Sequence, residues 1–355
     1  IEEAMKPIIK IVIAAVLYYT GVELLLRKLW PRKGVAIFMF HSVQPPSSIT
    51  RLAGFCIDPQ IFEKQIRFLS RYNCVSMSAV AAAAAGNAEL PRDAIAITFD
   101  DGYADNYYVA YPILKKYGLS STIYLTTNFI GTDQWLPLNR LYDAVERTEA
   151  VEVILPSELG LRDGRPFTLG LNTENDKQEA VTYIRSRLKL IQTDEFERIV
   201  DLLCTQLLGK MKRARSEEFK MLSWQEVRAM QDLVEYGSHT MSHCIVSKVS
   251  EERLRQELKA SKFEIEKHTH KTVVHFAYPN GRREDYDERA MTFLNDMGYR
   301  TAVTTVHGVN TSISKPFELR RLTMEEPRCV IALELLGIFV TVRQWLRLKG
   351  WGLQF

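Results

Sequence analysis

The chain has 355 residues, of which 46% are hydrophobic and 25% charged, a composition typical of a globular protein. It excludes a disordered, a collagen-like or a small disulfide-framework protein. The 46 basic and 43 acidic side chains leave a formal net charge of +3, so the balance gives no reason to expect nucleic acid as a partner. Five scattered cysteines without a Cys-x-x-Cys pair indicate neither a disulfide framework nor a cysteine zinc site.

The beginning of the chain is an apolar segment with basic flanks. Its uncharged part, 11–22, is shorter than the roughly 20 residues that span a bilayer. We expect a membrane-associated helix over 5–33 that either just spans the bilayer or lies in its interface. We favour a retained helix over a cleaved signal peptide, because no small-residue cleavage site follows. The alternative is that this helix packs only against the rest of the protein.

From Gly34 onward, short apolar runs alternate with amphipathic helices, which is typical of βα units and a parallel sheet. The predicted strands cover 34–41, 94–100, 121–127, 233–239, 272–279, 299–305 and 318–324. Predicted helices cover 58–72, 81–85, 104–117, 137–148, 176–190, 194–210, 250–267 and 284–297, and a further helix is expected to begin at Ser223. Asp58 is expected to cap the first of them, and Ser223 with Glu226 to form a capping box.

Three segments divide the chain. An α/β domain is expected over 34–325, interrupted by a helical insertion over 132–222 in which the strand and helix alternation lapses. A second amphipathic helix is expected within 326–350, where apolar residues recur over 330–348. The fold class predicted is therefore α/β, with a helical insertion and amphipathic helices at both ends.

Polar residues of the types that act as metal ligands or catalytic groups follow several of the predicted strands. In parallel α/β folds, ligand sites form at the carboxyl ends of the strands. The residues found there are His41, the pair Asp100 and Asp101, the pair His239 and His243, and the run 278–281.

Two of these sets together indicate a metal site. A spacing of four residues would place His239 and His243 on one side of a helical turn, and imidazole with carboxylate suits zinc or a related divalent ion. Asp100 and Asp101 are adjacent, so the chain must turn if both serve one site, and Gly102 supplies that freedom. One carboxylate would then bind the cation and the other accept a proton. The alternative is that one of these Asp residues only caps the helix near residue 104.

These segments resemble the motifs of the polysaccharide deacetylase family, of the carbohydrate esterase family four type that includes nodulation deacetylases. TFDDGY at 98–103 resembles the first motif. SHTMSH at 238–243 resembles the second, H-[ST]-x-x-H, and FAYPNG at 276–281 is similar to the third. The opening FMFHSV, at 38–43, is similar to the first strand of many bacterial members. The resemblance covers roughly 34–324, the insertion excepted.

What the resemblance implies is a distorted (β/α)7 barrel and metal-dependent hydrolysis of an acetyl group, generally N-acetyl, from a sugar. Carried over to this sequence, Asp100 is the general base, and the metal ligands are Asp101, His239 and His243. The third motif would contact the substrate and its oxyanion through Tyr278, Pro279 and Asn280, with the backbone N–H of Asn280 as the oxyanion donor.

The sequence departs from the family pattern in two places. Ala277 stands where many members carry an Arg that orients the base, so Arg320 or Arg321 is the expected substitute. The late Leu-x-His motif that supplies a general acid is not recognisable. We therefore expect His41 to protonate the leaving amine. His307 is the second candidate, although we favour a loop histidine without a catalytic role for it.

Taken together, the sequence predicts a membrane-associated bacterial deacetylase acting on an N-acetylated amino sugar of a cell-envelope polysaccharide or of a lipid-linked glycan precursor. The expected cofactor is a divalent metal, with zinc first and cobalt, nickel or manganese as alternatives. O-deacetylation or deformylation by the same site, or a non-catalytic glycan-binding role, are the competing hypotheses. The positive-inside rule favours an enzyme on the cytoplasmic side of the inner membrane. Four basic residues follow the apolar segment 11–22 and only two precede it: Arg27, Lys28, Arg32 and Lys33 against Lys6 and Lys10.

Overall fold

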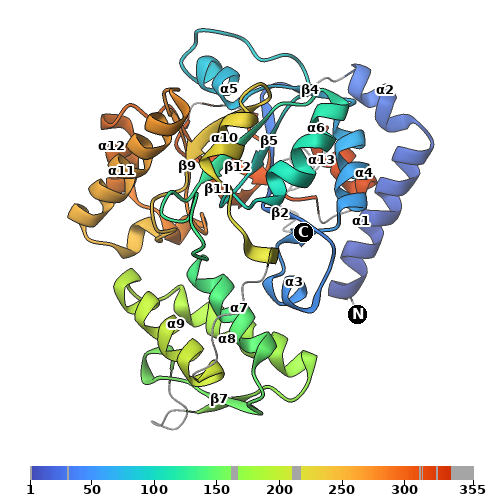
Figure 1. Ribbon diagram of the computed structural model, residues 1–355. Coiled ribbons are helices and arrows are strands. Elements are labelled where there is room, and N and C mark those ends of the chain that lie inside the picture. The colour runs from blue at the N-terminus through green and yellow to red at the C-terminus, as the bar shows by residue number, and fades with distance from the viewer. Residues whose placement is uncertain are drawn as a thin grey trace.

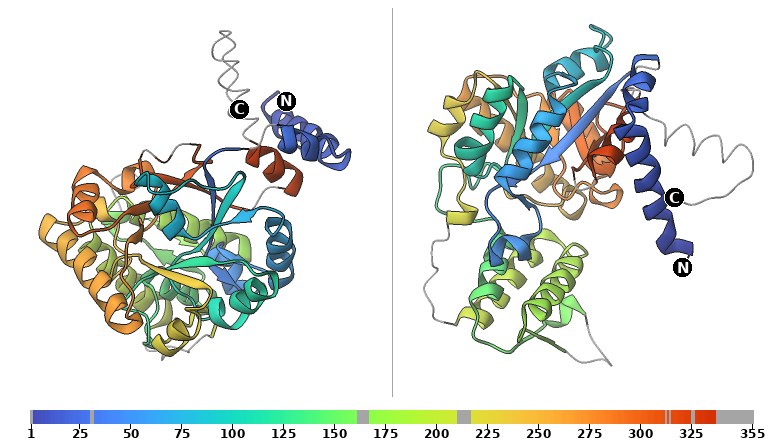
Figure 2. Two further views of the ribbon diagram at one scale, coloured as in Figure 1. Left: turned by 90° about the horizontal axis from the view of Figure 1, so that it is seen from above. Right: turned by 90° about the vertical axis from the view of Figure 1, so that its right-hand side faces the viewer.

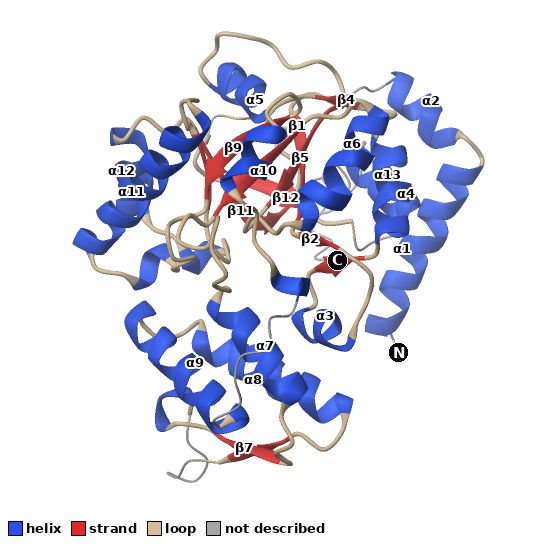
Figure 3. Ribbon diagram, viewed as in Figure 1, coloured by secondary structure: helices blue, strands red, loops and turns tan. Residues whose placement is uncertain are grey.

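The computed structural model describes residues 2–29, 32–160, 167–209, 217–311, 313, 315–324 and 327–336. Within these residues, seven parallel strands close into a barrel, because β1 (Val35–Phe40) pairs with both β12 (Leu319–Leu322) and β5 (Ala94–Phe99). Helices surround this barrel, as Figure 3 shows by secondary structure. The α/β barrel predicted from the sequence is confirmed.

The barrel strands follow the predicted order. Between β5 and β12 the sheet runs through β6 (Ser121–Leu125), β9 (Val234–Ser238), β10 (His275–Ala277) and β11 (Thr301–His307). A short strand, β4 (Asn73–Cys74), adds to β5 outside the closed ring. Two further short strands, β2 (Ser42–Val43) and β3 (Cys56–Ile57), pair with each other beside the barrel.

Both faces of β5, β6 and β10 are buried, which explains why these strand sequences are almost continuously apolar. In β1, Val35 and Ile37 pack in a cluster with Ala94 and Ala96 of β5, whereas Ala36 and Phe38 pack in the larger cluster with the helices. Strand side chains alternate between faces with a period of two. The first set therefore lines the barrel interior, and residues two and four positions further along each strand continue on the same inner face.

Helices connect the strands, and several local signals are confirmed. The side chain of Asp58 caps α4 (Pro59–Leu69), and Ser223 with Glu226 forms a capping box at α10 (Trp224–Ala229). Ser250 caps α11 (Glu251–Thr269). The remaining connecting helices are α3 (Ser48–Ala53), α5 (Met77–Ala84), the π-helical turn η1 (Asn106–Ala110) with α6 (Tyr111–Tyr117), and α12 (Glu288–Asp296). Short 3₁₀ turns lie at η3 (Glu217–Phe219), η4 (Val246–Lys248) and η5 (Arg283–Asp285).

The segment predicted as an insertion lies at one end of the barrel, below it in Figure 1. Its helices are α7 (Pro137–Arg147), α8 (Glu174–Leu188) and α9 (Thr193–Leu208), close to the predicted ranges. An antiparallel pair, β7 (Glu152–Ile154) and β8 (Thr168–Gly170), was not expected from the sequence. These two strands have three residues each, and η2 (Ser157–Leu159) follows the first. Three residues are too few to show the apolar and polar alternation by which a strand is recognised in a sequence.

The chain begins with two helices, α1 (Glu2–Tyr19) and α2 (Val22–Leu29), which run along one side of the barrel beside α13 (Arg328–Leu335) (Figures 1 and 2). Ala14 of α1 is buried against Val330 and Leu333 of α13. Among the described residues, no helix combines the length and the apolar character needed to cross a membrane. The predicted C-terminal amphipathic helix is described only as far as residue 336, and its remainder lies outside the described residues.

Candidate metal and catalytic site

Strand parity brings the polar residues together at the carboxyl end of the barrel. Asp100 continues the inner positions of β5, His41 those of β1, and His239 follows β9 on the same face as Gly237. Arg321 lies on the inner face of β12, two residues after the inner-facing Leu319. The site is therefore built from side chains that extend the interior of the barrel to its rim.

The expected metal ligands form one cluster. The Nε2 atoms of His239 and His243 lie 3.5 and 3.3 Å from Oδ1 of Asp101. One donor atom of each residue falls within 4.8 Å of the other two. Among the described residues, this is the one group of three or more His, Cys, Asp or Glu side chains whose donor atoms are close enough to hold a metal ion.

The chemistry of this cluster fits a divalent cation. Oδ1 of Asp101 is buried and has no hydrogen-bond partner among the described residues, as a carboxylate oxygen reserved for a cation would be. Nδ1 of His239 donates to the carbonyl of Ala277 at 2.8 Å, which leaves the Nε2 lone pair facing the cluster. Burial lowers the pKa of His239 to about 4, so its imidazole is neutral at pH 7. Burial alone would raise the pKa of Asp101, but the two histidines and His41 outweigh it and hold that pKa below its usual range.

The backbone reaches this geometry through left-handed residues. Asp101 has φ 73° and Gly102 φ 91°, so the chain turns directly after Asp100 and neither Asp caps the following helix. The expectation of a helical turn between the two histidines is wrong. Thr240 (φ 64°) and His243 (φ 62°) place that segment in an irregular loop, because contacts from other elements fix its backbone in place of helical hydrogen bonds.

Arg321 is the residue that holds the predicted base. Its two Nη atoms each donate to one carboxylate oxygen of Asp100 at 2.7 Å, and its Nε donates to the carbonyl of Thr304. Both partners are buried. Burial by itself would raise the pKa of Asp100, yet the Arg321 charge, with His239, keeps that pKa below its usual value. Arg320 is exposed on the other face of the strand, so of the two expected arginines only Arg321 reaches the site.

His41 lies at the rim of the same site. Its Nε2 is 3.9 Å from Oδ2 of Asp100, and a quarter of its side chain is exposed. The adjoining backbone is held from η1: the carboxylate of Asp105 accepts hydrogen bonds from Ser42 and Val43, and Asn106 donates to the carbonyl of His41. The sequence analysis did not identify Asp105 and Asn106, although both lie within three residues of the end of the TFDDGY motif.

His307 does not join the site. It lies at the end of β11, 57% of its side chain is exposed, and its Nε2 is 3.4 Å from Glu334 of α13. This position agrees with the preferred interpretation of His307 as a histidine without a catalytic role.

The aromatic ring of the third motif is packed into the core, so Tyr278 offers no exposed ring surface to a substrate. Tyr278 is fully buried, stacked on Tyr286 at a centroid distance of 4.4 Å and packed edge-on against Phe276. Pro279 is buried as well. Asn280 takes a left-handed conformation (φ 59°), and among the hydrogen bonds of the described residues none uses its N–H as a donor. This N–H is therefore without an acceptor among the described residues.

A further buried acid, Glu257, was not anticipated from the sequence. It lies on α11, and its carboxylate accepts hydrogen bonds from the loop that carries both histidines. A signal was present: Glu257 falls within the buried stripe of α11 formed by Leu254, Leu258, Ser261 and Ile265, where an acidic residue is expected only with partners.

Comparison with known proteins identifies relatives of this chain. Residues 87–154 and 176–302 match the family model described as polysaccharide deacetylase. YxkH of Bacillus subtilis is 28% identical over 118 residues, which are 33% of this chain and 40% of YxkH. The Escherichia coli poly-beta-1,6-N-acetyl-D-glucosamine N-deacetylase is 29% identical over 97 residues, 27% of this chain and 14% of that enzyme. The chain thus spans less than half the length of these relatives.

The fold has a solved counterpart in Streptococcus pyogenes deacetylase PplD, whose structure is in complex with acetate. The two structures superpose with a TM-score of 0.55 at 19% sequence identity, over 86% of this chain and 99% of PplD. At this identity the likeness establishes the barrel fold. Since the family model matches more than half of the chain and its motif residues meet at the end of a closed barrel, this protein belongs to the polysaccharide deacetylase family.

Proposed function

We propose that this protein is a metal-dependent deacetylase that hydrolyses N-acetyl groups of an amino sugar. The observation that carries the proposal is the pairing of two groups at one rim: the Asp101, His239 and His243 cluster, and the Asp100 carboxylate held by Arg321. Metal-dependent hydrolysis of an amide at neutral pH uses metal ligands and, beside them, a base that takes a proton from water. Asp101 and Asp100 place a ligand and a base on adjacent residues.

In this proposal, Asp101, His239 and His243 hold a divalent cation, with zinc as the first candidate. When bound, such a cation polarises a carbonyl and makes water a stronger acid. Asp100, kept ionised by Arg321, accepts the proton of the attacking water. The tetrahedral oxyanion accepts a hydrogen bond from the N–H of Asn280.

His41 is proposed as the acid that protonates the leaving amine. It is the imidazole that lies near Asp100 without being part of the ligand cluster, and it is partly open to solvent. Its backbone is fixed through Asp105 and Asn106, so the ring has a stable position from which to donate. In this proposal the two proton transfers are separate: Asp100 accepts a proton from water, and His41 donates a proton to the leaving amine.

The proposed substrate is an N-acetylated amino sugar in a cell-envelope polysaccharide or a lipid-linked glycan precursor. The named activity of the Escherichia coli relative, N-deacetylation of a poly-N-acetylglucosamine, supports an amide rather than an ester. The exposed apolar side chains of the first two helices support a surface-bound substrate, since a protein held at a membrane gains effective concentration there.

We also propose that α1 and α2 contact a membrane, on the cytoplasmic face. Large apolar side chains of these two helices are exposed. Soluble monomeric proteins rarely expose so many large apolar side chains on neighbouring elements. The exposed side chains are Ile11, Val12, Ile13, Val16, Tyr19, Val22, Leu24, Leu25 and Leu29. Lys28 and Lys33 are exposed nearby and suit anionic headgroups. Binding to vesicles of phosphatidylglycerol and phosphatidylcholine tests this. A Val12→Ser, Val16→Ser variant should bind more weakly, and equal binding of both proteins would refute the contact.

The function is tested by release of acetate from two substrate classes: polymeric N-acetylhexosamine and membrane-extracted lipid-linked glycan. Purified protein is compared before and after chelation, with Asp100→Asn alongside. Release that is lost with chelator and with Asp100→Asn supports the proposal and identifies the substrate class. N-formyl and O-acetyl sugars are assayed alongside, and release of formate or of acetate from these sugars alone would replace N-deacetylation with deformylation or O-deacetylation. Glycan binding without any release would leave a non-catalytic role.

A further inference from the structure

The local sequence of the loop between the two histidine ligands does not by itself stabilise the conformation of that loop. Thr240 and His243 both lie in the left-handed region, which costs a residue with a side chain roughly 1–2 kcal/mol. In the absence of a helix, the four-residue spacing does not by itself bring His239 and His243 to one point. Groups outside the loop must therefore fix its shape.

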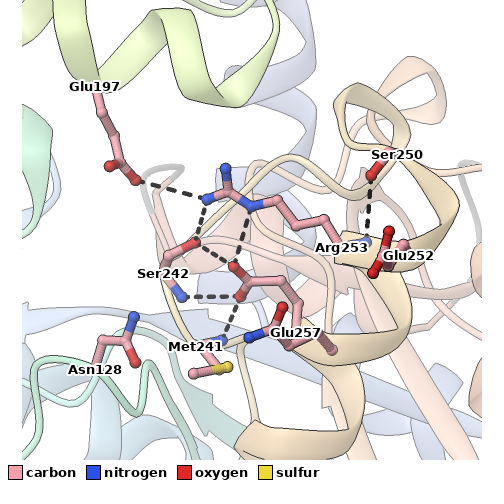
Figure 4. A pocket seen from close by; sticks show the side chains of 9 residues that line it. Asn128, Glu197, Met241, Ser242, Ser250, Glu252, Arg253 and Glu257 are labelled. Atoms are coloured by element: carbon pink, nitrogen blue, oxygen red, sulfur yellow. Dashed lines mark hydrogen bonds and ion pairs between the residues drawn. The ribbon is translucent and has the colours of Figure 1, made fainter.

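Glu257 of α11 is the principal group that does so. Its Oε2 accepts from the backbone N–H of Met241 at 2.8 Å and of Ser242 at 3.0 Å, and its Oε1 accepts from the Ser242 hydroxyl at 2.7 Å (Figure 4). The residue is 5% exposed. On the other side of the loop, the backbone N–H groups of Thr127 and Asn128 donate to the carbonyls of Thr240 and Met241. The loop is thus held between the segment that follows β6 and helix α11.

A single arginine extends these contacts to the insertion. The Nε of Arg253 lies 3.6 Å from Oε1 of Glu257, and its Nη2 lies 3.5 Å from the Ser242 hydroxyl. The same guanidinium pairs with Asp194 and, at 3.8 Å, with Glu197, both on α9. Figure 4 shows Arg253 between Glu197 on one side and Ser242 with Glu257 on the other.

This bridge is accessible from solvent. A cavity of about 460 Å³ lies between α9, the histidine loop and α11, and Arg253, Glu257 and Ser242 are among the residues that line it. A change in the position of α9 would alter the ion pairs of Arg253 with Asp194 and Glu197. Because Arg253 also contacts Glu257, such a change would affect the carboxylate that accepts hydrogen bonds from the histidine loop.

We propose that Glu257 is a positioning residue for the metal site and that Arg253 couples this site to helix α9 of the insertion. The inference rests on the metal site of the proposed function. Glu257 does not touch the metal or the substrate. It acts by holding the backbone of Met241 and Ser242, and therefore the separation and direction of His239 and His243. Residues that orient metal ligands in this way typically contribute 10- to 100-fold to metal affinity.

The test is metal affinity of the full chain, measured with Co²⁺ alone by competition with a chelator, together with the visible absorption spectrum of bound Co²⁺. In Glu257→Gln, one oxygen that accepts from the loop becomes an NH₂ group. We expect Co²⁺ binding about 10- to 100-fold weaker and a changed spectrum. Glu252→Gln is the matched control, because Glu252 lines the same cavity on the same helix and, in the described part of the chain, has no hydrogen bond to the loop.

The outcomes are distinguishable. If the unaltered protein binds no Co²⁺, the metal site itself is refuted and this inference falls with it. If the unaltered protein binds Co²⁺ and Glu257→Gln binds it equally well with the same spectrum, Glu257 has no positioning role. Should Glu257→Gln fail to fold, Ser242→Ala removes one contact of the same carboxylate. A smaller loss of affinity and an altered spectrum are then expected, and an unchanged affinity and spectrum would overturn the role.

The coupling to the insertion has its own variants. Asp194→Asn with Glu197→Gln releases Arg253 from α9 without touching the loop, and exposed ion pairs of this kind change an equilibrium about two- to fivefold. We expect Co²⁺ affinity to change by that factor. The same double substitution made in the Arg253→Gln background should have no further effect. An unchanged affinity in the Arg253-containing protein, or an equal effect in both backgrounds, would overturn the coupling.

Discussion

Replacing Arg321 with Met should destabilise the protein strongly, because it leaves the Asp100 carboxylate buried without its counter-ion. The two Nη–Oδ contacts are both 2.7 Å, and the two side chains are 0% and 2% exposed. Breaking such a buried pair by removing one partner costs about 3–5 kcal/mol. This is a large fraction of the 5–15 kcal/mol that stabilises a typical domain. We expect the free energy of unfolding in urea to fall by that amount and acetate release to fall about 10²-fold or more.

Arg320 provides the matched control, since it is the adjacent residue on the same strand with its side chain on the exposed face. Arg320→Met should change the free energy of unfolding by less than about 0.5 kcal/mol. Adding Asp100→Asn to Arg321→Met removes the uncompensated charge and should recover at least about 1 kcal/mol. Equal losses in the two arginine variants, or no recovery in the double variant, would refute the role assigned to the Arg321–Asp100 pair.

Further predictions concern the metal, the acid, a turn and pH. Saturating the chelated protein with zinc at a hundredfold excess over its dissociation constant should stabilise it by about 2.7 kcal/mol in thermal unfolding, and Asp101→Asn should abolish this gain. His41→Asn should lower kcat about 10²- to 10⁴-fold with little change in Tm, because the ring is partly exposed; an unchanged kcat would remove it as the acid. Gly102→Ala should cost more than about 1 kcal/mol in urea unfolding, since φ is 91° and a Cβ would lie 2.8 Å from a neighbouring side-chain carbon. Burial lowers the pKa of His275 to about 3, so as pH falls the unfolded chain takes up the proton first and stability is lost. Between pH 7 and 5 this should remove about 2 kcal/mol, and a His275→Gln variant with the same pH dependence as the unaltered protein would contradict it.

The strands and helices of the barrel were predictable because their signals are local. A buried strand is an apolar run of fixed length, and a helix start carries its own cap, as at Asp58 and Ser223. The same local pattern places Asp100 and His239 at the ends of strands. The hairpin β7–β8 escaped prediction because strands of three residues leave too short a pattern, and its pairing comes from residues that are apart in sequence.

The sequence alone thus determined the order of the elements, the family motifs and the identity of the ligand and base candidates, since each depends on neighbours within a few residues. Only the tertiary structure decided which arginine holds the base, because Arg321 and Asp100 are 221 residues apart and meet only when β12 and β5 close on β1. It also decided that the histidine loop is irregular rather than helical. The hydrogen bonds that fix it come from Glu257 on α11 and from the backbone after β6, and local periodicity carries no information about partners that far along the chain.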